Sequence, residues 1–280
     1  MLIIDCHCHA GKGDGLTGPW DTNAPLNDFM RWSVEAGIQK TNLFAAFHSD
    51  YAIANAQVAT IVKQNPEKFY GFAFIHAERD RGRVKSMVQK AVSDYGFCGI
   101  KAHRHDARIS REICEVAQIF QIPVLYDIVG EVSTVALIAE EYPQVNFIIP
   151  HLGSFADDWR SQLALISCLE RFPNVYTDTS GIRRFDILKK AFDRVGADKI
   201  LFGTDGPWLH PKVELSKIYA LTSDAKSLQK MLAYNFLQLI SKVKKPNFSQ
   251  RPISTGIKTQ GGFVQPSNYR DPWLVEDNFL

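Results

Sequence analysis

Two histidines near the N-terminus form the sharpest chemical signal in the sequence. They lie in the segment Asp5-Cys6-His7-Cys8-His9. If this segment is a strand, His7 and His9 project to one face and the two cysteines to the other. Two imidazoles placed in this way can bind one divalent ion, whereas a mixed cysteine and histidine zinc site would need both faces at once. The spacing therefore predicts a metal site, with two hydrogen-bonded core histidines as the structural alternative.

Further groups that could bind a metal or move a proton come directly after later apolar segments. Each of them alone would more often be structural than catalytic. Burying an imidazole or a carboxylate costs free energy unless the group is paired or bound to a metal, so a packed core gives no reason for several of them at one position. The shared position at the ends of four segments therefore favours an active site, and the four residues are His103, Asp127, His151 and Asp205.

The elements that must position these residues are predicted from hydrophobic patterning. Eight segments of strand length are apolar almost throughout, as is typical of parallel strands buried on both faces. Helical periodicity follows them, for example over 80–95, 110–120, 131–142, 155–172 and 185–195. The eight predicted strands are Leu2–His7, Lys40–Ala46, Tyr70–Ile75, Phe97–His103, Pro123–Asp127, Val145–Pro150, Val175–Asp178 and Lys199–Thr204.

Alternation of eight strands with helices predicts an α/β fold, and the number of strands favours a closed (β/α)8 TIM barrel over an open doubly wound sheet. The chain has 280 residues, which is compatible with one such barrel. No glycine-rich dinucleotide fingerprint follows the first strand, which argues against a nucleotide-binding sheet. In a barrel the carboxyl ends of the strands carry the active site, and the candidate residues lie at those ends.

Composition excludes several classes of partner. The net charge of +2 gives no electrostatic reason to expect nucleic acid or an anionic membrane surface. No apolar stretch is long enough to span a membrane, and the first residues lack the features of a signal peptide. The cysteines, at 6, 8, 98, 114 and 168, are odd in number and scattered, which favours free thiols in a reducing compartment. We therefore expect a cytoplasmic protein.

The character of the sequence changes near its C-terminus. We predict a barrel domain over 1–241 and an irregular extension over 242–280, which prolines and glycines punctuate. This extension ends in an unusually apolar segment for a free tail. Our hypothesis is that it docks onto the barrel or a neighbouring subunit, and the apolar residues are Trp273, Leu274, Val275, Phe279 and Leu280.

Taken together, these motifs resemble the amidohydrolase superfamily, in the branch that includes aminocarboxymuconate semialdehyde decarboxylase and related aromatic-acid decarboxylases and hydrolases. They occur in the family's order and cover roughly residues 1–240. They are specific for the branch and not for one substrate. The matching segments are Asp5–His9, Gly99–His103, Ile149–Gly153, Asn174–Ser180 and Leu201–Pro207.

The resemblance implies a role for each matching residue. It makes His7 and His9 metal ligands, and Asp205 a ligand that also takes a proton from water. His151 would polarise the substrate or shuttle a proton beside the metal. The implied cofactor is one divalent ion, zinc in most of the family, and the implied partners are a small-molecule substrate and a second subunit in a homodimer.

One departure concerns the fifth strand, where the family usually has a histidine ligand and this chain has Asp127. We predict that Asp127 completes the set of ligands with His7, His9 and Asp205, which makes the site harder and more anionic and shifts the preference towards manganese or magnesium. Alternatively, His103 or His105 supplies the missing imidazole, or metal binding is weakened or lost. A carboxylated Lys101 that bridges two metals is a further alternative.

Residues that face the substrate are predicted from the loops that follow the strands. His48, His103, Arg104 and His105 could face an anionic or aromatic substrate, and Trp20 and Trp208 could form an apolar wall. A plain surface or packing role is the alternative for each of them.

The leading function is metal-dependent hydrolysis of an amide, lactone or related acyl bond in a small molecule. Non-oxidative decarboxylation of an aromatic or unsaturated acid is the close alternative, since both reactions can use the same metal ligands. A catalytically silent barrel that serves as a binding module is the alternative from another class.

Overall fold

The barrel is built from eight parallel strands. The computed structural model describes residues 1–17 and 21–243. Neighbouring strands pair in chain order, and the two-residue strand β2 (Asn23–Ala24) adds an antiparallel pairing to the end of β1. The parallel strands are β1 (Ile4–Lys12), β3 (Lys40–Ala45), β4 (Phe69–Phe74), β5 (Gly99–His103), β6 (Val124–Asp127), β7 (Phe147–Ile149), β8 (Val175–Asp178) and β9 (Ile200–Leu201).

Backbone hydrogen bonds between β1 and the segment after β9 close the sheet. The amide of Cys6 donates to the carbonyl of Phe202 at 3.0 Å, and the amide of Asp205 donates to the carbonyl of His7 at 2.8 Å. The buried Asp5 carboxylate strengthens this junction, because it accepts both the amide and the hydroxyl of Thr204, at 2.9 and 2.7 Å. The closed sheet with helices outside it is a (β/α)8 TIM barrel, as the sequence predicts.

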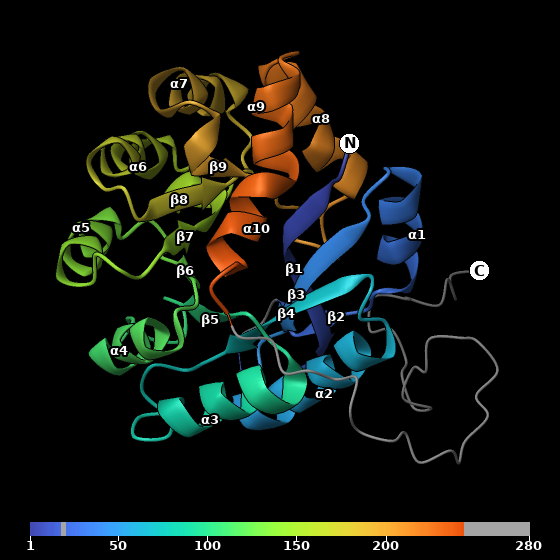
Figure 1. Cartoon of the computed structure of the whole chain (residues 1–280), viewed down its shortest axis with the longest axis vertical. Coiled ribbons are helices and arrows are strands. Elements are labelled where there is room, and N and C mark those ends of the chain that lie inside the picture. The colour runs from blue at the N-terminus through green and yellow to red at the C-terminus, as the bar shows by residue number, and fades with distance from the viewer. Residues whose placement is uncertain (18–20, 244–280) are drawn as a thin grey trace, which may run out of the picture. The chain divides into compact units, whose positions relative to one another are not determined.

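Helices surround the barrel, as Figure 1 shows. Several begin at a side chain that accepts a backbone amide, for example Asp50 before α2 and Ser110 before α4. The helices are α1 (Asn27–Glu35), α2 (Tyr51–Gln64), α3 (Val84–Lys90), α4 (Arg111–Phe120), α5 (Val132–Glu141), α6 (Trp159–Arg171), α7 (Phe185–Val195), α8 (Pro211–Leu221), α9 (Ala225–Gln229) and α10 (Asn235–Ile240).

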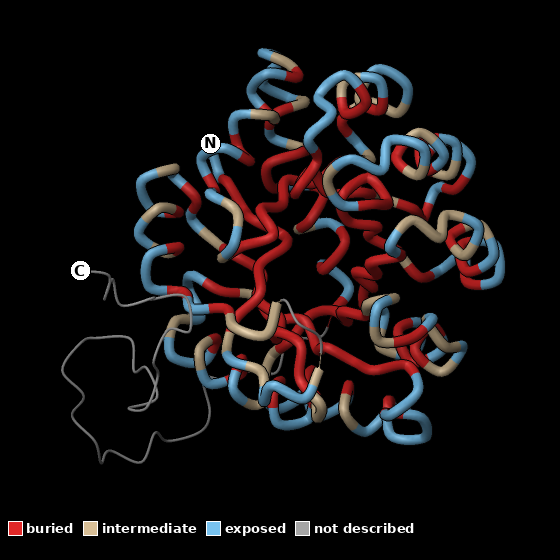
Figure 2. Tube along the Cα trace, turned by 180° about the vertical axis from the view of Figure 1, so that it is seen from behind, coloured by how far each residue is buried: buried red, intermediate tan, exposed pale blue. Residues whose placement is uncertain are grey.

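Apolar side chains seal the barrel near the start of β4. Phe236 of α10 packs against Tyr70 and Phe72, with ring centroids 5.4 and 6.0 Å apart. The amide of Phe202 donates to the carbonyl of Met231, which lies in the π-helical turn Lys230–Tyr234 before α10. This hydrogen bond connects the C-terminal helix to the barrel. Buried residues follow the strands and the inner faces of the helices (Figure 2).

All eight predicted strands are present, and β1 continues beyond its predicted end to Lys12. The predicted helix over 185–195 matches α7, while the one over 80–95 is shorter and becomes a π-helical turn over Ala91–Tyr95. Within the described ranges, no helix is long and apolar enough to cross a membrane. The predicted C-terminal extension and Trp20 lie outside the described residues, apart from 242 and 243.

Candidate metal centre

Three imidazoles and one carboxylate converge where β1, β7 and β9 end. Nε2 of His7 and Nε2 of His9 lie 3.2 and 3.8 Å from Oδ1 of Asp205. One ligand atom from each of His7, His151 and Asp205 lies within 4.8 Å of the others. All four side chains are buried. This cluster brings together the first-strand pair, the sixth-strand histidine and the last aspartate that the sequence singled out.

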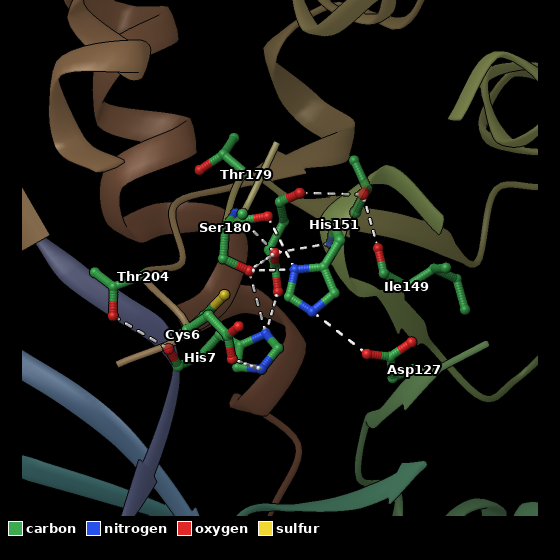
Figure 3. A network of polar contacts seen from close by, with 12 residues as sticks. Cys6, His7, Asp127, Ile149, His151, Thr179, Ser180 and Thr204 are labelled. Carbon is green, nitrogen blue, oxygen red and sulfur yellow. Dashed lines mark hydrogen bonds and ion pairs between the residues drawn. The ribbon is translucent and has the colours of Figure 1, made fainter. Parts of the chain in front are cut away.

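The tautomer of His7 follows from its partners. Nδ1 lies 2.8 Å from Oδ2 of Asp178, and the same carboxylate accepts the Ser180 hydroxyl at 2.6 Å (Figure 3). A carboxylate can only accept, so Nδ1 of His7 carries the proton and Nε2 of the neutral ring has a lone pair. The contact from Nε2 to Asp205 lacks hydrogen-bond geometry, and no described residue hydrogen-bonds to this nitrogen.

The other two imidazoles are oriented in the same way. Nδ1 of His9 lies 2.8 Å from the carbonyl of Ala45, and Nδ1 of His151 lies 2.9 Å from the carbonyl of Ser180. Both acceptors require a proton on Nδ1. Each Nε2 is therefore left with a lone pair when the ring is neutral, and it faces the cluster with Asp205.

These lone pairs are the test of whether a metal fits. Nε2 of His7 and Nε2 of His151 face carboxylate oxygens of Asp205 and Asp127 at 3.2 and 3.3 Å. A lone pair facing an anion at such a distance is repulsive unless a cation lies between them, either a proton on the ring or a metal ion. Neutral imidazoles held through Nδ1 by a carboxylate or a carbonyl are the usual donors to zinc and related ions. The described residues thus fit one divalent ion.

Asp178 belongs to the candidate site by its contact with His7 and was not predicted from the sequence, although it lies within one of the quoted motifs. It ends β8, as Asp127 ends β6, and this position is the signal that could have identified it. Gly203 allows its close approach to His7, because a Cβ at this glycine would lie 3.0 Å from Cβ of His7 and 3.1 Å from Cγ of Asp178. A side chain at this position would therefore displace the pair.

Backbone strain also marks the site. Positive φ angles occur at His151 (58°) and Asp205 (57°), and at two further residues around the cavity, Asp21 (55°) and Val129 (47°). Residues other than glycine adopt this conformation at an energetic cost, which folds tend to retain at functional positions. None of this is visible in residue types alone.

Asp127 stands between two histidines. Its Oδ2 lies 3.2 Å from Nε2 of His103 and 3.3 Å from Nε2 of His151, and its Oδ1 accepts the amide of Val129 at 2.9 Å. Nδ1 of His103 accepts the amide of His105 at 3.0 Å, so the neutral ring carries its proton on Nε2, which faces Oδ2 of Asp127. His103 is thereby directed at Asp127, and it contributes no lone pair to the cluster at Asp205.

The histidines of the site differ in their pKa values. Burial acts to lower the pKa of His151, but the carboxylates of Asp127 and Asp205 outweigh it and raise that pKa to about 9. Burial and the Lys101 ammonium hold the pKa of His9 well below its usual range. Burial opposes ionisation of Asp178, yet His7 beside it holds the pKa of that carboxyl at about 2. Burial acts to lower the pKa of His7 as well, but the Asp178 carboxylate outweighs it and raises that pKa, so without a metal both His7 and His151 favour the protonated form more than His9 does.

A cavity of about 680 Å³ opens above the cluster. It is large enough for a small organic molecule. Its lining includes the four cluster residues, Asp127, and two side chains that sequence analysis did not assign to the substrate, Asp21 and Phe155. Burial and the Asp205 carboxylate raise the pKa of Asp21 to about 6.

The predicted substrate-facing residues divide into two groups. His103, Arg104, His105 and Trp208 line the cavity, with the Trp208 ring centroid 4.9 Å from that of His9 and the Arg104 guanidinium paired to Glu131 at 2.7 Å. His48 is not among the described residues that line it. Its Nδ1 instead accepts the amide of Asp50 at 2.9 Å and lies 3.6 Å from Asp14.

Comparison with solved structures finds the same fold. A 2,6-dihydroxybenzoate decarboxylase from Rhizobium has 17% identity and a TM-score of 0.64, with 86% of this chain and 98% of that chain covered. A dihydroxybenzoic acid decarboxylase from Polaromonas sp. JS666, solved with manganese and 2-nitroresorcinol, has 17% identity and a TM-score of 0.64, with 86% of this chain and 97% of that chain covered. A probable 2-pyrone-4,6-dicarboxylic acid hydrolase from Acinetobacter baumannii, with citric acid bound, has 14% identity and a TM-score of 0.66, with 86% of this chain and 100% of that chain covered.

Comparison by sequence identifies the family. No match was found among curated proteins. The sequence model of the family described as amidohydrolase matches residues 4–235, nearly the whole barrel. This range contains every residue of the cluster. The chain therefore belongs to this amidohydrolase family and is an enzyme of its superfamily.

Proposed function

We propose that this protein is a metal-dependent hydrolase that cleaves a C–N or C–O acyl bond in a small molecule, such as a lactone or a cyclic amide. One observation carries the proposal. Three imidazoles are committed through Nδ1 to acceptors. Nε2 of His7 and Nε2 of His9 face the Asp205 carboxylate, and His151 lies in the same cluster beside a cavity.

The residues that would hold the ion are His7, His9, His151 and Asp205. A bound divalent ion supplies Lewis acidity, which polarises a carbonyl and makes water easier to deprotonate. Three imidazoles and one carboxylate suit zinc, manganese or iron, whereas Asp127 as a ligand in place of His151 would favour manganese or magnesium. We infer the first set because Asp127 is already held by His103 and Val129.

Within this arrangement, Asp205 accepts a proton from the attacking water at a carboxylate oxygen. Asp127 presents its Oδ2 beside His151, where it can orient that water or hold the proton that passes to the leaving group. Trp208 packs against His9 at the cavity wall and limits the access of bulk water to this side. Hydrolysis therefore needs no residue from outside the described cavity.

Decarboxylation is the second candidate. The cavity has aromatic walls at Trp208 and Phe155, and two of the structural neighbours named above are decarboxylases of dihydroxybenzoic acids. In that reaction the same ligands would hold the substrate while a carboxylic acid or imidazolium of the site protonates the ring carbon.

One experiment separates the two reactions. The metal-loaded protein is incubated with a panel of lactones, cyclic amides and aromatic acids, and both ring opening and carbon dioxide release are measured. Ring opening that stops on chelation and returns with the metal supports the hydrolase. Carbon dioxide release alone would replace it with the decarboxylase. Activity that survives His7→Ala combined with His9→Ala would contradict the site itself.

A further inference from the structure

Lys101 is a buried cation that lines the cavity and that the reaction above does not use. It lies in β5, its side chain is fully buried, and it belongs to the cavity lining. No described residue hydrogen-bonds to its Nζ. The nearest aromatic contact is the ring of Phe44, whose centroid lies 4.9 Å from Nζ. An ammonium group in this environment is costly unless a partner compensates it.

Two partly buried lysines elsewhere in the described chain have hydrogen-bond acceptors for their Nζ atoms. Nζ of Lys199 donates to the carbonyls of Phe172, Pro173 and Val175, at 2.6 to 3.1 Å. Nζ of Lys217 donates to the carbonyls of Thr179 and Ile182 and pairs with Glu214. Lys101 is more buried than either, yet it has no such set of acceptors. The difference indicates that its partner comes from the cavity.

Nearby carboxylates favour the charge on Lys101 without contacting it. Burial lowers the pKa of Lys101 below the ordinary value of a lysine, and the carboxylates of Asp127, Asp205 and Asp178 offset only part of this effect. Their oxygens are directed elsewhere, Asp127 towards His103 and His151 and Asp205 towards His7 and His9. The amino group of Lys101 thus lies among anions, but no described residue accepts a hydrogen bond from it.

We propose that Lys101 is a specificity-determining residue that binds a carboxylate of the substrate. This inference rests on the proposed function and narrows it to organic anions. The carboxylate bound by Lys101 is one that remains in the product. An ammonium contact stabilises the charged carboxylate, and so it would oppose departure of that group as neutral carbon dioxide. The substrate therefore carries a carboxylate in addition to the acyl bond that is cleaved.

The test measures binding, so it does not depend on turnover. Benzoate and its neutral analogue benzamide are titrated by calorimetry into the metal-loaded wild-type protein and into Lys101→Met. We expect the wild type to prefer benzoate by at least about tenfold, the order of a charge-assisted hydrogen bond, and Lys101→Met to lose that preference while its affinity for benzamide and its metal content stay unchanged. Lys101→Gln is the second variant, should Lys101→Met fail to fold.

Lys199→Met is the matched control, because Lys199 is a partly buried lysine outside the cavity lining and its Nζ donates to three backbone carbonyls. We expect its preference for benzoate to match that of the wild type. Arg104→Met is the competing variant, because Arg104 is the other cavity cation of β5 and its loop. The proposal is overturned if both Lys101 variants keep the preference, or if only Arg104→Met loses it. Two metal ions per chain that fall to one in Lys101→Met would also overturn it, since a carboxylated lysine would then be a metal ligand.

The two proposals fail in different ways. Loss of the anion preference in Lys101→Met, without any metal-dependent turnover, would support the role of Lys101 and count against the hydrolase. Metal-dependent hydrolysis of neutral lactones at rates equal in wild type and Lys101→Met would support the hydrolase and overturn the role of Lys101.

Discussion

The two sides of the cavity differ in whether their polar side chains have partners within the described chain. We define the closure side as His7 and His9 of β1, Asp178 of β8 and Asp205 of the segment after β9. Here each imidazole Nδ1 has a fixed acceptor, and each Nε2 faces the Asp205 carboxylate. On the middle side, defined as Lys101, His103 and Asp127 from β5 and β6, one cation has no hydrogen-bond partner in the described chain.

This difference indicates how one barrel can hold a resident metal ion on one side and a substrate group on the other. Hydrogen bonds to other groups already orient the imidazoles of the closure side, so they need little rearrangement when an ion binds. The closure side therefore suits a resident metal. An unsatisfied buried ammonium suits a group that arrives with the substrate and leaves with the product. His151 lies between the sides, because it contacts Asp127 on one and shares the metal cluster with Asp205 on the other.

The largest expected effect is on the closure side. Replacing Asp205 by Asn removes the charge of a ligand and the group that accepts a proton from water. We expect kcat/KM to fall on the order of a thousandfold or more, within the range for a lost general base. Steady-state kinetics on the substrate found by the panel provides the measurement, and a variant within tenfold of wild type would refute this role.

The next effect concerns the group that orients His7. In Asp178→Ala, Nδ1 of His7 loses its acceptor and the ring is free to rotate or change tautomer. Metal affinity should fall by about 10- to 100-fold, the usual cost of losing such an outer partner. Metal titration with a competing chelator measures this. Asp186→Ala is the control, because Asp186 pairs with Arg184 on the surface, and equal losses in the two variants would argue against a specific role.

A smaller effect is expected on the middle side. His103→Gln removes the imidazole that faces Asp127 but leaves the candidate metal cluster in place. We expect kcat to fall by about tenfold, as for slight misplacement of a catalytic group, with metal content unchanged. Loss of the metal in this variant would instead identify His103 as the ligand that compensates for the missing fifth-strand histidine.

The smallest effect is a pH dependence of stability in the metal-free protein. The pKa of His151 is raised to about 9 in the folded state, above its ordinary value of 6.5. The protonated ring therefore stabilises the fold fully below pH 6.5, and this contribution is lost as pH rises through 9. Tm should fall by several degrees between pH 7 and 9.5, at roughly 2 to 4 °C for each kcal/mol lost.

Metal loading should remove this dependence, because Nε2 of His151 then binds the ion and needs no proton. The comparison therefore uses chelated and metal-loaded samples over the same pH range, with His151→Asn as the variant that lacks the group. Equal slopes in chelated and loaded wild-type protein would place His151 outside the metal cluster.

The strands could be predicted because parallel barrel strands are buried on both faces and are thus nearly all apolar. Their carboxyl ends identified His7, His9, His151 and Asp205 for the same reason, since a charged group at the end of an apolar strand is conspicuous. β1 was underestimated at its end, where Gly11 and Lys12 pair with Ala24 and Asn23 across an antiparallel turn that has no apolar signature.

What escaped prediction depends on side-chain orientation. The role of Asp178 requires its distance to His7, and the free Nζ of Lys101 requires knowledge of every neighbouring acceptor. The assignment of Asp127 as a metal ligand rests only on the strand that it ends, and it stays a prediction. The contacts of Asp127 with His103 and Val129 come from pairing between β5 and β6 and from the turn after Asp127.

The most direct test of the central claim, that the closure side holds a resident metal, is elemental analysis of the purified protein beside the His7→Ala, His9→Ala double variant. The account predicts one divalent ion per chain in the wild type and almost none in the double variant. Equal metal content in the two proteins, or a wild type that binds no divalent ion when it is supplied, would contradict it.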